Sequence, residues 1–465
     1  MANKSKGAEI TRRAFFRRLG LAGAAAGLAS CGGGRAGADA SGVAMTCRTD
    51  PKTGRGVSLL GYGCMRWPQR REPAEDGNLV DQEAVNRLVD YAIAHGVNYF
   101  DTAPVYSQGW SEKVTGAALK RHPRERYFIA TKMSADADLS RENMTAMYRR
   151  SLADLQVDYI DYYLLHAIGG GGMEMFNRRF MDNGMLDFLL GERDKGRIRH
   201  LGWSFHGDID VFDKVLGMHH AVHWDFVQIQ LNYVDWRHAA AYNSDWQAAM
   251  GDDTNAEYLY GELAKRGIPV VVMEPLLGGR LAGVTQDVLA DMKRRRPGDS
   301  AAAWAFRFAG SLPGVLPVLS GMTYKEHLQD NLRTFSPLEP LSGEELGFLE
   351  DVARRMADSK NIPCTACGYC MPCPYGVDIP ALFVHYNKCV NHGLVVSDRL
   401  DSRYAEARRA FLIGYDRSAP RLRQAARCIG CGQCAPKCPQ GIDIPSQMRL
   451  IDGYVEQLRR AAPGL

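Results

Sequence analysis

The sequence predicts an α/β protein: a (β/α)8 barrel followed by a smaller, mainly helical domain. Two observations predict it. Short apolar runs alternate with helical patterns over residues 55–345, and eight cysteines then gather in two tight groups between residues 364 and 438. The chain has 465 residues, of which 46% are hydrophobic and 24% are charged. This composition supplies enough apolar material for a sizeable core and more than one domain.

Charge and hydropathy exclude two classes of partner. The formal net charge is +4, which is close to balanced for this length. The chain therefore lacks the basic field of a nucleic-acid binder. No apolar run reaches the roughly 20 residues that a membrane span needs. We expect neither a nucleic-acid partner nor a membrane-spanning helix.

The N-terminus resembles an export signal. The stretch TRRAFF at residues 11–16 matches the twin-arginine export signal, and the short apolar run Leu19–Ser30 is typical of a cleaved signal. The following LASC resembles a lipobox, in which Cys31 is lipidated. We expect a signal over residues 1–31, a flexible linker over 32–54, and a periplasmic or membrane-anchored protein. The alternative is a cytoplasmic protein with a basic tail and a chance arginine pair.

The barrel prediction depends on eight apolar runs in order along the chain. They are Val57–Gly61, Tyr99–Asp101, Tyr127–Thr131, Tyr159–Leu165, His200–Trp203, Phe226–Gln230, Pro269–Met273 and Val315–Leu319. Helical patterns such as Gln82–His95 and Met144–Leu155 separate them. Eight such units over about 290 residues fit a barrel fold that typically runs ~250 residues.

Polar residues follow three neighbouring strands where each strand ends. Asp101 ends the second strand, Lys132 follows the third and His166 the fourth, while Tyr106 comes five residues after Asp101. In this fold, catalytic groups lie at the C-terminal ends of the strands. A lone lysine or histidine there is usually structural, but four together predict an acid catalyst. We expect Lys132 to make the phenol proton of Tyr106 easier to release, Asp101 to hold Lys132, and His166 to orient a carbonyl.

These residues lie in motifs that resemble the aldo-keto reductase family. The motifs are FDTAPVYSQGWSEKVTGAAL (100–119), FIATK (128–132), YYLLH (162–166) and GWSFHG (202–207), and the resemblance covers residues 48–345. It implies a catalytic tetrad of Asp101, Tyr106, Lys132 and His166, with Tyr106 as the general acid. It also implies a small-molecule carbonyl or alcohol substrate, and NAD(P)H bound extended across the barrel mouth.

The resemblance further implies a set of cofactor-binding residues. The nicotinamide amide would meet Ser204 and either Gln228 or Gln230, of which Gln228 is preferred. Backbone N–H groups of the loop at 274–280 would cradle the pyrophosphate. The implied residues are Ser204, Gln228, Gly278, Gly279, Ser320, Gly321, Asp330 and Asn331. Met273 and Phe205 depart from the family pattern, and the choice between NADH and NADPH stays open.

The clustered cysteines form two runs of four, Cys364, Cys367, Cys370 and Cys373, and then Cys428, Cys431, Cys434 and Cys438. Cysteines three apart, three in a row, cannot all pair as disulfides without strain. A structural zinc site usually takes two CxxC pairs that a spacer separates. The runs instead match the C-x2-C-x2-C-x3-C-P pattern of bacterial two-cluster ferredoxins, which predicts two [4Fe–4S] clusters.

In that pattern the fourth cysteine of each run ligates the other cluster. One cluster would take Cys364, Cys367, Cys370 and Cys438, and the other Cys428, Cys431, Cys434 and Cys373. The first run departs from the pattern, since only two residues separate Cys370 from Cys373. Each run leads into a repeat, CPYGVDIP (373–380) and CPQGIDIP (438–445). With a helical insert that includes Arg403–Phe411, residues 346–465 resemble an α-helical ferredoxin, and Cys389 reads as a buried or free thiol.

The two parts together resemble the subfamily of aldo-keto reductases that carry a C-terminal [4Fe–4S] domain. The leading hypothesis is NAD(P)H-linked carbonyl or alcohol chemistry coupled to electron transfer through two clusters, with an electron-transfer protein as a partner. One alternative is an ordinary reductase with structural clusters, and another is a non-catalytic exported redox relay or sensor. Because such clusters are assembled in the cytoplasm, a protein that carries them is best exported folded. The signal and the cysteines therefore support each other.

Overall fold

The computed structural model describes residues 29–30, 44–239, 255–357, 361–438 and 440–460. The twin-arginine motif and Cys31 lie outside the described residues, so export and lipidation stay predictions. Within the part of the chain that is described, no helix is both long and apolar enough to cross a membrane.

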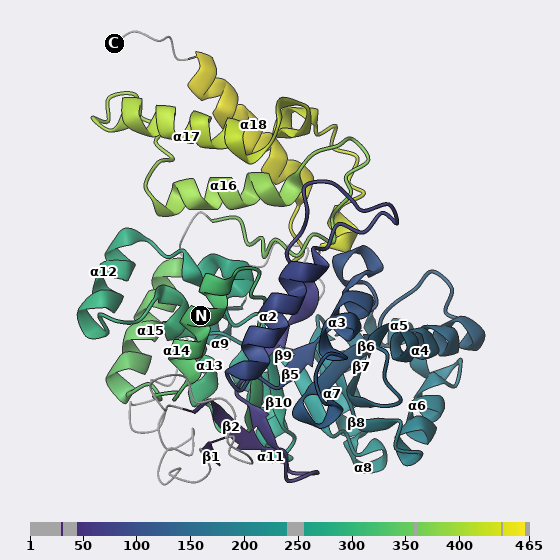
Figure 1. Ribbon diagram of the computed structural model, residues 1–465. Coiled ribbons are helices and arrows are strands. Elements are labelled where there is room, and N and C mark those ends of the chain that lie inside the picture. The colour runs from purple at the N-terminus through teal and green to yellow at the C-terminus, as the bar shows by residue number, and fades with distance from the viewer. Residues whose placement is uncertain (1–28, 31–43, 240–254, 358–360, 439, 461–465) are drawn as a thin grey trace, which may run out of the picture.

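Eight parallel strands close into a barrel, as the sequence predicts (Figure 1). Around the ring they follow the order β10-β11-β4-β5-β6-β7-β8-β9. Their bounds are β4 Leu60–Gly63, β5 Tyr99–Asp101, β6 Phe128–Met133, β7 Ile160–Gly169, β8 Ile198–His206, β9 Phe226–Gln230, β10 Val270–Met273 and β11 Val315–Ser320. The helices that separate and follow them include α2 Gln82–Ala94, α3 Ser111–Leu119, α4 Arg141–Leu155, α6 Met185–Asp194, α7 Ile209–Gly217, α11 Ala256–Lys265, α13 Ala301–Ser311 and α14 Lys325–Phe335.

The first predicted strand, at residues 57–61, is in fact two strands. β3 Gly56–Ser58 pairs antiparallel with β2 Thr46–Thr49, which also pairs with β1 Ala29–Ser30, and the chain then enters β4 of the barrel. The backbone N–H of Ser58 bonds the side chain of Asn98 at 2.8 Å, where β3 ends. An apolar run looks the same in sequence whether one strand or two successive strands use it. The linker prediction of 32–54 is therefore wrong for residues 44–54, which are folded.

The buried carboxylate of Asp50 holds the β2–β3 hairpin to the end of the barrel where the strands begin. Oδ2 of Asp50 accepts a hydrogen bond from the hydroxyl of Tyr162 at 2.5 Å, and Nε2 of His200 lies 2.8 Å from the same oxygen. Burial alone would raise the pKa of Asp50, but the interactions with His200 and Tyr162 outweigh it and lower that pKa. The carboxylate thus stays ionised where β7 and β8 begin.

The barrel unit continues past its last strand into α15 Gly343–Ala357. Leu349, Val352 and Ala353 of this helix are buried in the same apolar core as the barrel helices. The domain boundary predicted at residue 345 is therefore wrong, and the barrel unit extends to residue 357. A helix that follows the last strand looks equally suitable for either domain until its apolar stripe is seen to face the barrel.

The C-terminal domain is built from α16 Ile379–Asn391, α17 Tyr404–Ser418 and α18 Ile444–Arg460 around a core of its own. The predicted repeat has a structural basis, because Asp378 and Asp443 each accept a backbone N–H of the helix that follows (3.4 and 3.2 Å). Both act as N-caps. The predicted helical insert is α17.

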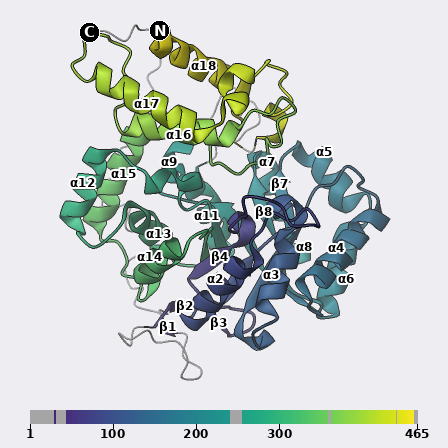
Figure 2. The ribbon, with the colours of Figure 1, turned by 45° about the horizontal axis from the view of Figure 1, so that its top comes forward.

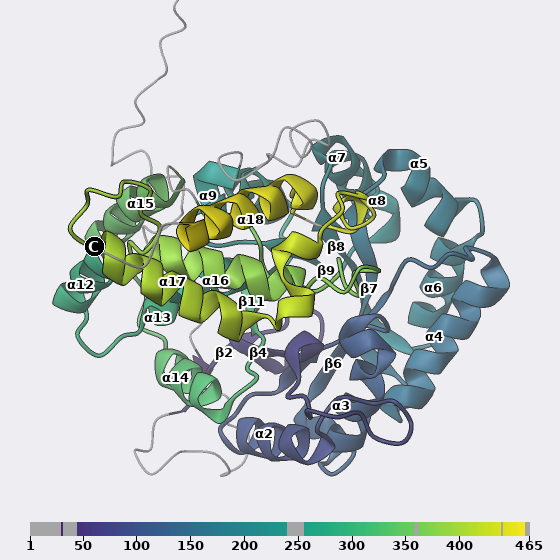
Figure 3. The ribbon, with the colours of Figure 1, turned by 90° about the horizontal axis from the view of Figure 1, so that it is seen from above.

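The helical domain covers one end of the barrel, and the hairpin lies at the other (Figures 1 and 2). Seen from above, α16, α17 and α18 lie across the barrel and leave α4 and α6 uncovered (Figure 3). Hydrogen bonds join the two units, among them Asn391 Nδ2 to the carbonyl of Gly283 at 2.5 Å. Since the hairpin closes the end where strands begin, the domain covers the mouth where strands end.

The close approach of α3 and α4 leaves no room for a side chain at Gly116. A Cβ atom there would lie 2.4 Å from the carbonyl oxygen of Asp154 and 2.6 Å from Cα of Leu155. We expect Gly116→Ala to lower the free energy of unfolding by about 1–3 kcal/mol through overpacking. Gly261, inside α11, has no atom within 4 Å of its Cβ position, so Gly261→Ala should add about 0.5–1 kcal/mol. Thermal unfolding of both variants checks this, and equal effects would contradict the packing argument.

Candidate functional site

The barrel mouth brings together the strand-end residues that the sequence singled out. Asp101 at the end of β5 is buried and accepts a hydrogen bond from Nζ of Lys132 on β6 at 2.5 Å. The same ammonium donates to the carbonyl of Thr102 at 2.8 Å. On β7, Nδ1 of His166 lies 2.7 Å from the hydroxyl of Ser134. Neighbouring parallel strands end at one edge, and this places the three side chains next to each other.

Tyr106 completes the predicted tetrad from the turn Tyr106–Gly109. Nζ of Lys132 lies 4.8 Å from the centre of its ring, and the ring of His166 stands edge-on to it with 6.1 Å between centroids. The four predicted catalytic residues therefore lie together at the mouth. A phenol, an imidazole and a lysine–aspartate ion pair in one place can deliver a proton to a bound oxygen atom.

The protonation states differ in part from the sequence-based expectation. Burial, with the nearby charges of Asp101 and Glu274, raises the pKa of Tyr106 well above its usual value. The net direction is opposite to the easier proton release expected from Lys132, because burial and the charge of Asp101 dominate. Burial and the charge of Lys132 hold the pKa of His166 well below its usual range. Tyr106 thus keeps its proton, and His166 is neutral.

Two further ionisable residues lie at the mouth and were not predicted as site residues. His206 ends β8, and burial together with Lys132 lowers its pKa to about 4. Glu274 follows β10, and burial raises the pKa of its carboxyl group. Both lie in sequence stretches that were noted, GWSFHG and the loop at 274–280. Their strand-end positions were the signal that could have identified them.

The predicted nicotinamide-binding pair is placed beside the tetrad. Ser204 and Gln228 are buried and pair across β8 and β9. Gln228 donates from Nε2 to Asp101 at 3.2 Å, whereas Gln230 donates to Asp235 at 2.6 Å. Gln228 thus contacts the tetrad, while the preference for it over Gln230 at the nicotinamide amide stays a prediction. The hydroxyl of Ser204 accepts the backbone N–H of Ala167 at 2.9 Å.

The residues predicted for the adenosine end fall into two groups. Asn331 donates to the hydroxyl of Ser320 at 3.0 Å, and the Cβ position of Gly321 lies 3.2 Å from the side chain of Arg66. These three lie near the end of β11. Asp330 instead accepts the hydroxyl of Ser300 at 2.6 Å, the residue that caps α13. A carboxylate so engaged supports the fold between α13 and α14.

The loop predicted to cradle a pyrophosphate is covered in this arrangement. Gly278 and Gly279 adopt positive φ angles of 67° and 97°, as a turn of backbone N–H groups requires. The N–H of Gly278, however, donates to the carboxylate of Glu274 at 2.6 Å. A Cβ at Gly278 would lie 2.0 Å from Cα of Thr365, which belongs to the first cysteine run. An extended dinucleotide therefore fits this mouth only with the cysteine loop displaced.

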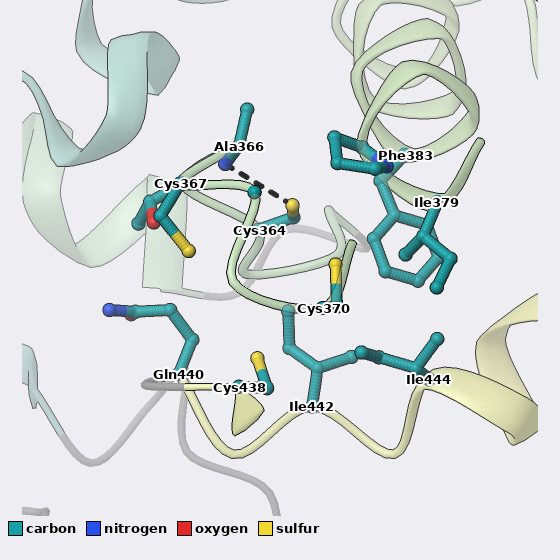
Figure 4. Close-up of a pocket in the computed structure, with 13 residues that line it drawn as sticks. Cys364, Ala366, Cys367, Cys370, Ile379, Phe383, Cys438, Gln440, Ile442 and Ile444 are labelled. Carbon is teal, nitrogen blue, oxygen red and sulfur yellow. Dashed lines mark hydrogen bonds between the residues drawn. The ribbon is translucent and has the colours of Figure 1, made fainter. Parts of the chain in front are cut away.

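Figure 4 shows the first cysteine cavity, whose lining includes Thr365, the residue that lies against Gly278. It is lined by Cys364, Cys367, Cys370 and Cys438, with Ile379 and Phe383 on its apolar wall. The backbone N–H of Ala366 donates to the sulfur of Cys364 at 3.3 Å, and Gly368 turns with a φ of 81°. Four thiols around an apolar space, with an N–H directed at sulfur, fit the demands of a [4Fe–4S] cluster.

The second cysteine cavity is lined by Cys373, Cys428, Cys431 and Cys434. Each cavity thus combines three thiols of one run with the last thiol of the other, which is the crossed arrangement that the spacing predicts. Among the described residues, no three cysteine, histidine or acidic side chains converge closely enough for a single metal ion. Cys389 is buried beside His385 and lines neither cavity.

The first cavity and the tetrad are neighbours across the domain contact. Arg66, which follows β4, donates to the carbonyls of Thr365 and Ala366 at 2.6 and 3.3 Å. Thr365, between Cys364 and Cys367, lies directly against Gly278 of the barrel mouth. Ile379 and Ile444 line both cavities, so the second cavity lies directly beyond the first. The order is tetrad, first cavity, second cavity.

Comparisons with known proteins agree with both parts of the chain. A model described as "Aldo/keto reductase family" matches residues 59–354, and one described as "4Fe-4S dicluster domain" matches residues 363–442. L-galactose dehydrogenase of Arabidopsis thaliana is 25% identical over 67% of this chain and 94% of its own length. Several other curated relatives, including the NADH-specific methylglyoxal reductase of Escherichia coli (32% identical over 24% of this chain), are matched over only 33% to 39% of their own length.

Solved structures share the barrel fold. The holo form of an aldo-keto reductase from Bacillus halodurans has 23% identity and a TM-score of 0.51, covering 66% of this chain and 96% of its own. A thermostable aldo-keto reductase in complex with epalrestat also has 23% identity, with a TM-score of 0.53 over 66% of this chain and all of its own. At this level of identity the likeness concerns the fold.

The neutral, partly buried His206 predicts a pH dependence of stability. Its pKa is about 4 in the folded protein and about 6.5 in an unfolded chain, so the unfolded state takes up the proton first as the pH falls. Its contribution is present above about pH 6.5 and is lost toward pH 4. We expect the melting temperature of His206→Gln to fall less than that of the parent between pH 7.5 and 5. The exposed His392→Gln serves as the control, and an unchanged pH response in His206→Gln would contradict this.

The crossed cysteine sets predict which cavity each thiol serves. Cys438→Ser should empty the first cavity and halve the iron bound per chain, although Cys438 belongs to the second run. Cys389→Ser, at a buried thiol outside both cavities, should leave the iron content unchanged. Iron and sulfide analysis with electron paramagnetic resonance measures both. Retention of two full clusters in Cys438→Ser would contradict the assignment.

Proposed function

The chain belongs to the aldo/keto reductase family and is an NAD(P)-dependent oxidoreductase, and from this premise we propose a more specific function. The protein interconverts a small-molecule carbonyl compound and its alcohol at Tyr106. Electrons for this reaction pass through two [4Fe–4S] clusters in the cysteine cavities. The observation that supports the proposal most strongly is the first cysteine loop, which Arg66 holds over the tetrad.

The tetrad residues have separable roles in this proposal. Tyr106 holds a proton that it gives to the oxygen of a bound carbonyl, since burial keeps the phenol protonated. Neutral His166, fixed by Ser134, orients that oxygen, and Asp101 holds Lys132 in place. The contact of Lys132 with the ring of Tyr106 supports the phenolate that remains after proton transfer.

The electron balance favours a role for the clusters. Reduction of a carbonyl to an alcohol takes two electrons and two protons, one that Tyr106 would place on oxygen and one from solution that would reach carbon with the electron pair. A [4Fe–4S] cluster, when bound, exchanges single electrons, so two adjacent clusters can hold the pair. The thiols of both cavities fit such clusters, and shared walls at Ile379 and Ile444 place them side by side.

A nicotinamide dinucleotide belongs to the proposal as the family's cofactor, with Ser204 and Gln228 at the nicotinamide end. Seating its pyrophosphate requires Thr365 to leave Gly278. NADH and NADPH are both candidates.

Export by the twin-arginine route, with lipid attachment at Cys31, completes the proposal. Its support is the motif TRRAFF and the need to fold around clusters before export. The protein would then act in the periplasm or at a membrane surface.

The proposal is tested by reoxidation of reduced clusters. Anaerobic protein is reduced with dithionite, freed of excess reductant, and mixed with a panel of small aldehydes and ketones while the cluster absorbance is followed. We expect at least one carbonyl compound to reoxidise the clusters, and Tyr106→Phe to slow that reaction by about 10²- to 10⁴-fold. The exposed Tyr258 on α11 supplies the matched control, Tyr258→Phe.

Parallel titrations with NADH and NADPH distinguish the electron sources. Bleaching of the clusters by either nucleotide would show that nicotinamide feeds them. Clusters that no carbonyl compound and no nucleotide oxidises or reduces, although dithionite reduces them, would overturn the coupling of barrel and clusters.

A further inference from the structure

The two cysteine cavities differ in their access to solution. The first lies under the barrel contact, where Arg66 bonds Thr365 and Ala366 and where Thr365 meets Gly278. The second faces outward, and its Cys431 is exposed. The second cavity therefore presents the more exposed thiol to a partner in solution, while the first lies against the barrel mouth.

Exposed apolar side chains surround the second cavity. Tyr375 and Ile429 line it and are 45% and 64% exposed. Leu422 is 69% exposed, and its carbonyl oxygen lies 3.9 Å from the Cβ position of Gly376, beside Tyr375. We call the surface formed by Tyr375, Leu422, Ile429 and Cys431 the outer cluster face.

The charge around the outer cluster face is positive. Arg421, Arg427 and Lys437 are exposed, and none of them forms an ion pair within the described part of the chain. Arg449 is also exposed, and its guanidinium lies 3.7 Å from the Cβ position of Gly430. Arg423 is paired with Asp378 at 3.2 Å.

The acidic groups here do not cancel this charge. Asp378 and Asp443 are the nearby carboxylates in residues 373–380 and 421–449, against five arginine and lysine residues. Asp443 is occupied as a helix cap, with its carboxylate on Ser446. The unpaired cations therefore present a field to the solution that favours a negatively charged partner.

We propose that the outer cluster face is the docking site of a small acidic protein that carries single electrons. The inference depends on the proposed function, because it takes the second cavity to hold a redox-active cluster. In the docked complex one electron passes between the partner's redox group and the cluster held by Cys373, Cys428, Cys431 and Cys434. One group is oxidised by one electron, the other is reduced by one, and two such events supply or remove the pair used at Tyr106.

A protein partner suits this face better than an anionic membrane. An exposed cluster thiol such as Cys431 is useful only if another redox group comes close to it, and phospholipids carry none. A few apolar side chains amid unpaired cations also match the usual anatomy of a transient interface, a small contact with steering charges around it. The shared walls at Ile379 and Ile444 then provide the route inward to the first cavity.

The test measures electron transfer and binding with defined probes. The cluster-loaded protein is mixed in stopped flow with a reduced small acidic ferredoxin, and with the same ferredoxin whose surface carboxylates have been coupled to ethylenediamine, as the opposite-charge probe with the same redox group. We expect faster cluster reduction by the acidic probe, with a rate that falls as ionic strength rises from 0.01 to 0.15 M, since screening shortens from about 30 to about 8 Å. Binding of the oxidised acidic probe is measured separately by biolayer interferometry.

Charge-reversal variants locate the site. The double variant Arg427→Glu/Lys437→Glu should slow reduction by the acidic probe and weaken its binding by about tenfold or more. The matched control reverses two exposed cations of α4, as Arg149→Glu/Arg150→Glu, which lie outside the area that the helical domain covers (Figure 3). Leu422→Gln tests the apolar part without touching a cysteine. Cluster absorbance confirms that each variant is loaded.

The outcomes are distinct from those of the proposed function. Equal rates with both probes, or equal losses in the α4 control and the outer-face variant, would overturn the docking site. Binding to vesicles with anionic phospholipid, lost in Arg427→Glu/Lys437→Glu while the ferredoxin shows no binding, would assign the face to a membrane and overturn the proposal. Tyr106→Phe should leave binding and cluster reduction unchanged, so a failure of carbonyl chemistry is recognised separately.

Discussion

The contact between the first cysteine loop and the barrel mouth is the constraint on which the rest of the structure depends. Arg66 donates two hydrogen bonds to carbonyls of that loop, and Gly278 leaves room for Thr365 because it has no side chain. Together these contacts hold a cavity lined by four thiols next to Tyr106. Without them a cluster in the first cavity would have no defined distance to the tetrad.

The mouth under this contact concentrates ionisable groups in a poorly hydrated space. Burying charge is costly unless the charge is paired, and Lys132 with Asp101 meets that requirement through a 2.5 Å hydrogen bond. Glu274 is satisfied by the N–H of Gly278, and the two histidines His166 and His206 stay neutral. Such perturbed groups in one place are characteristic of a catalytic centre, because electrostatic effects are strongest where water is excluded.

The two ends of the barrel are used differently. At the closed end, Asp50 ties the hairpin to Tyr162 and His200, a contact that supports the fold. At the other end, where the strands finish, the helical domain covers a mouth that loops alone would otherwise surround. This domain has one face toward the tetrad and another, basic and partly apolar, toward the solution. The chain therefore connects a chemical site to an outer surface through two adjacent cavities.

The sequence by itself was enough to predict the barrel, the four residues of the tetrad, and which four cysteines share each cavity. Period and spacing are local properties, so strand-end residues such as Asp101, Lys132 and His166 could be assigned to one mouth, and the crossed fourth cysteines Cys373 and Cys438 could be assigned to their partners. The same locality explains the errors. The apolar run at 57–61 forms two strands, and α15 packs on the barrel. Neither outcome could be predicted, because the local sequence pattern would be the same in either case.

Only the tertiary structure decided how the two domains meet. The coverage of Gly278 by Thr365, the contact of Arg66 with the cysteine loop and the burial of Glu274 and His206 join residues from different domains or distant strands. Their positions depend on how two folded surfaces fit, a property that no local pattern records. The protonation of Tyr106 was decided in the same way, since the pKa of a phenol depends on the water and the charges that the fold leaves around it.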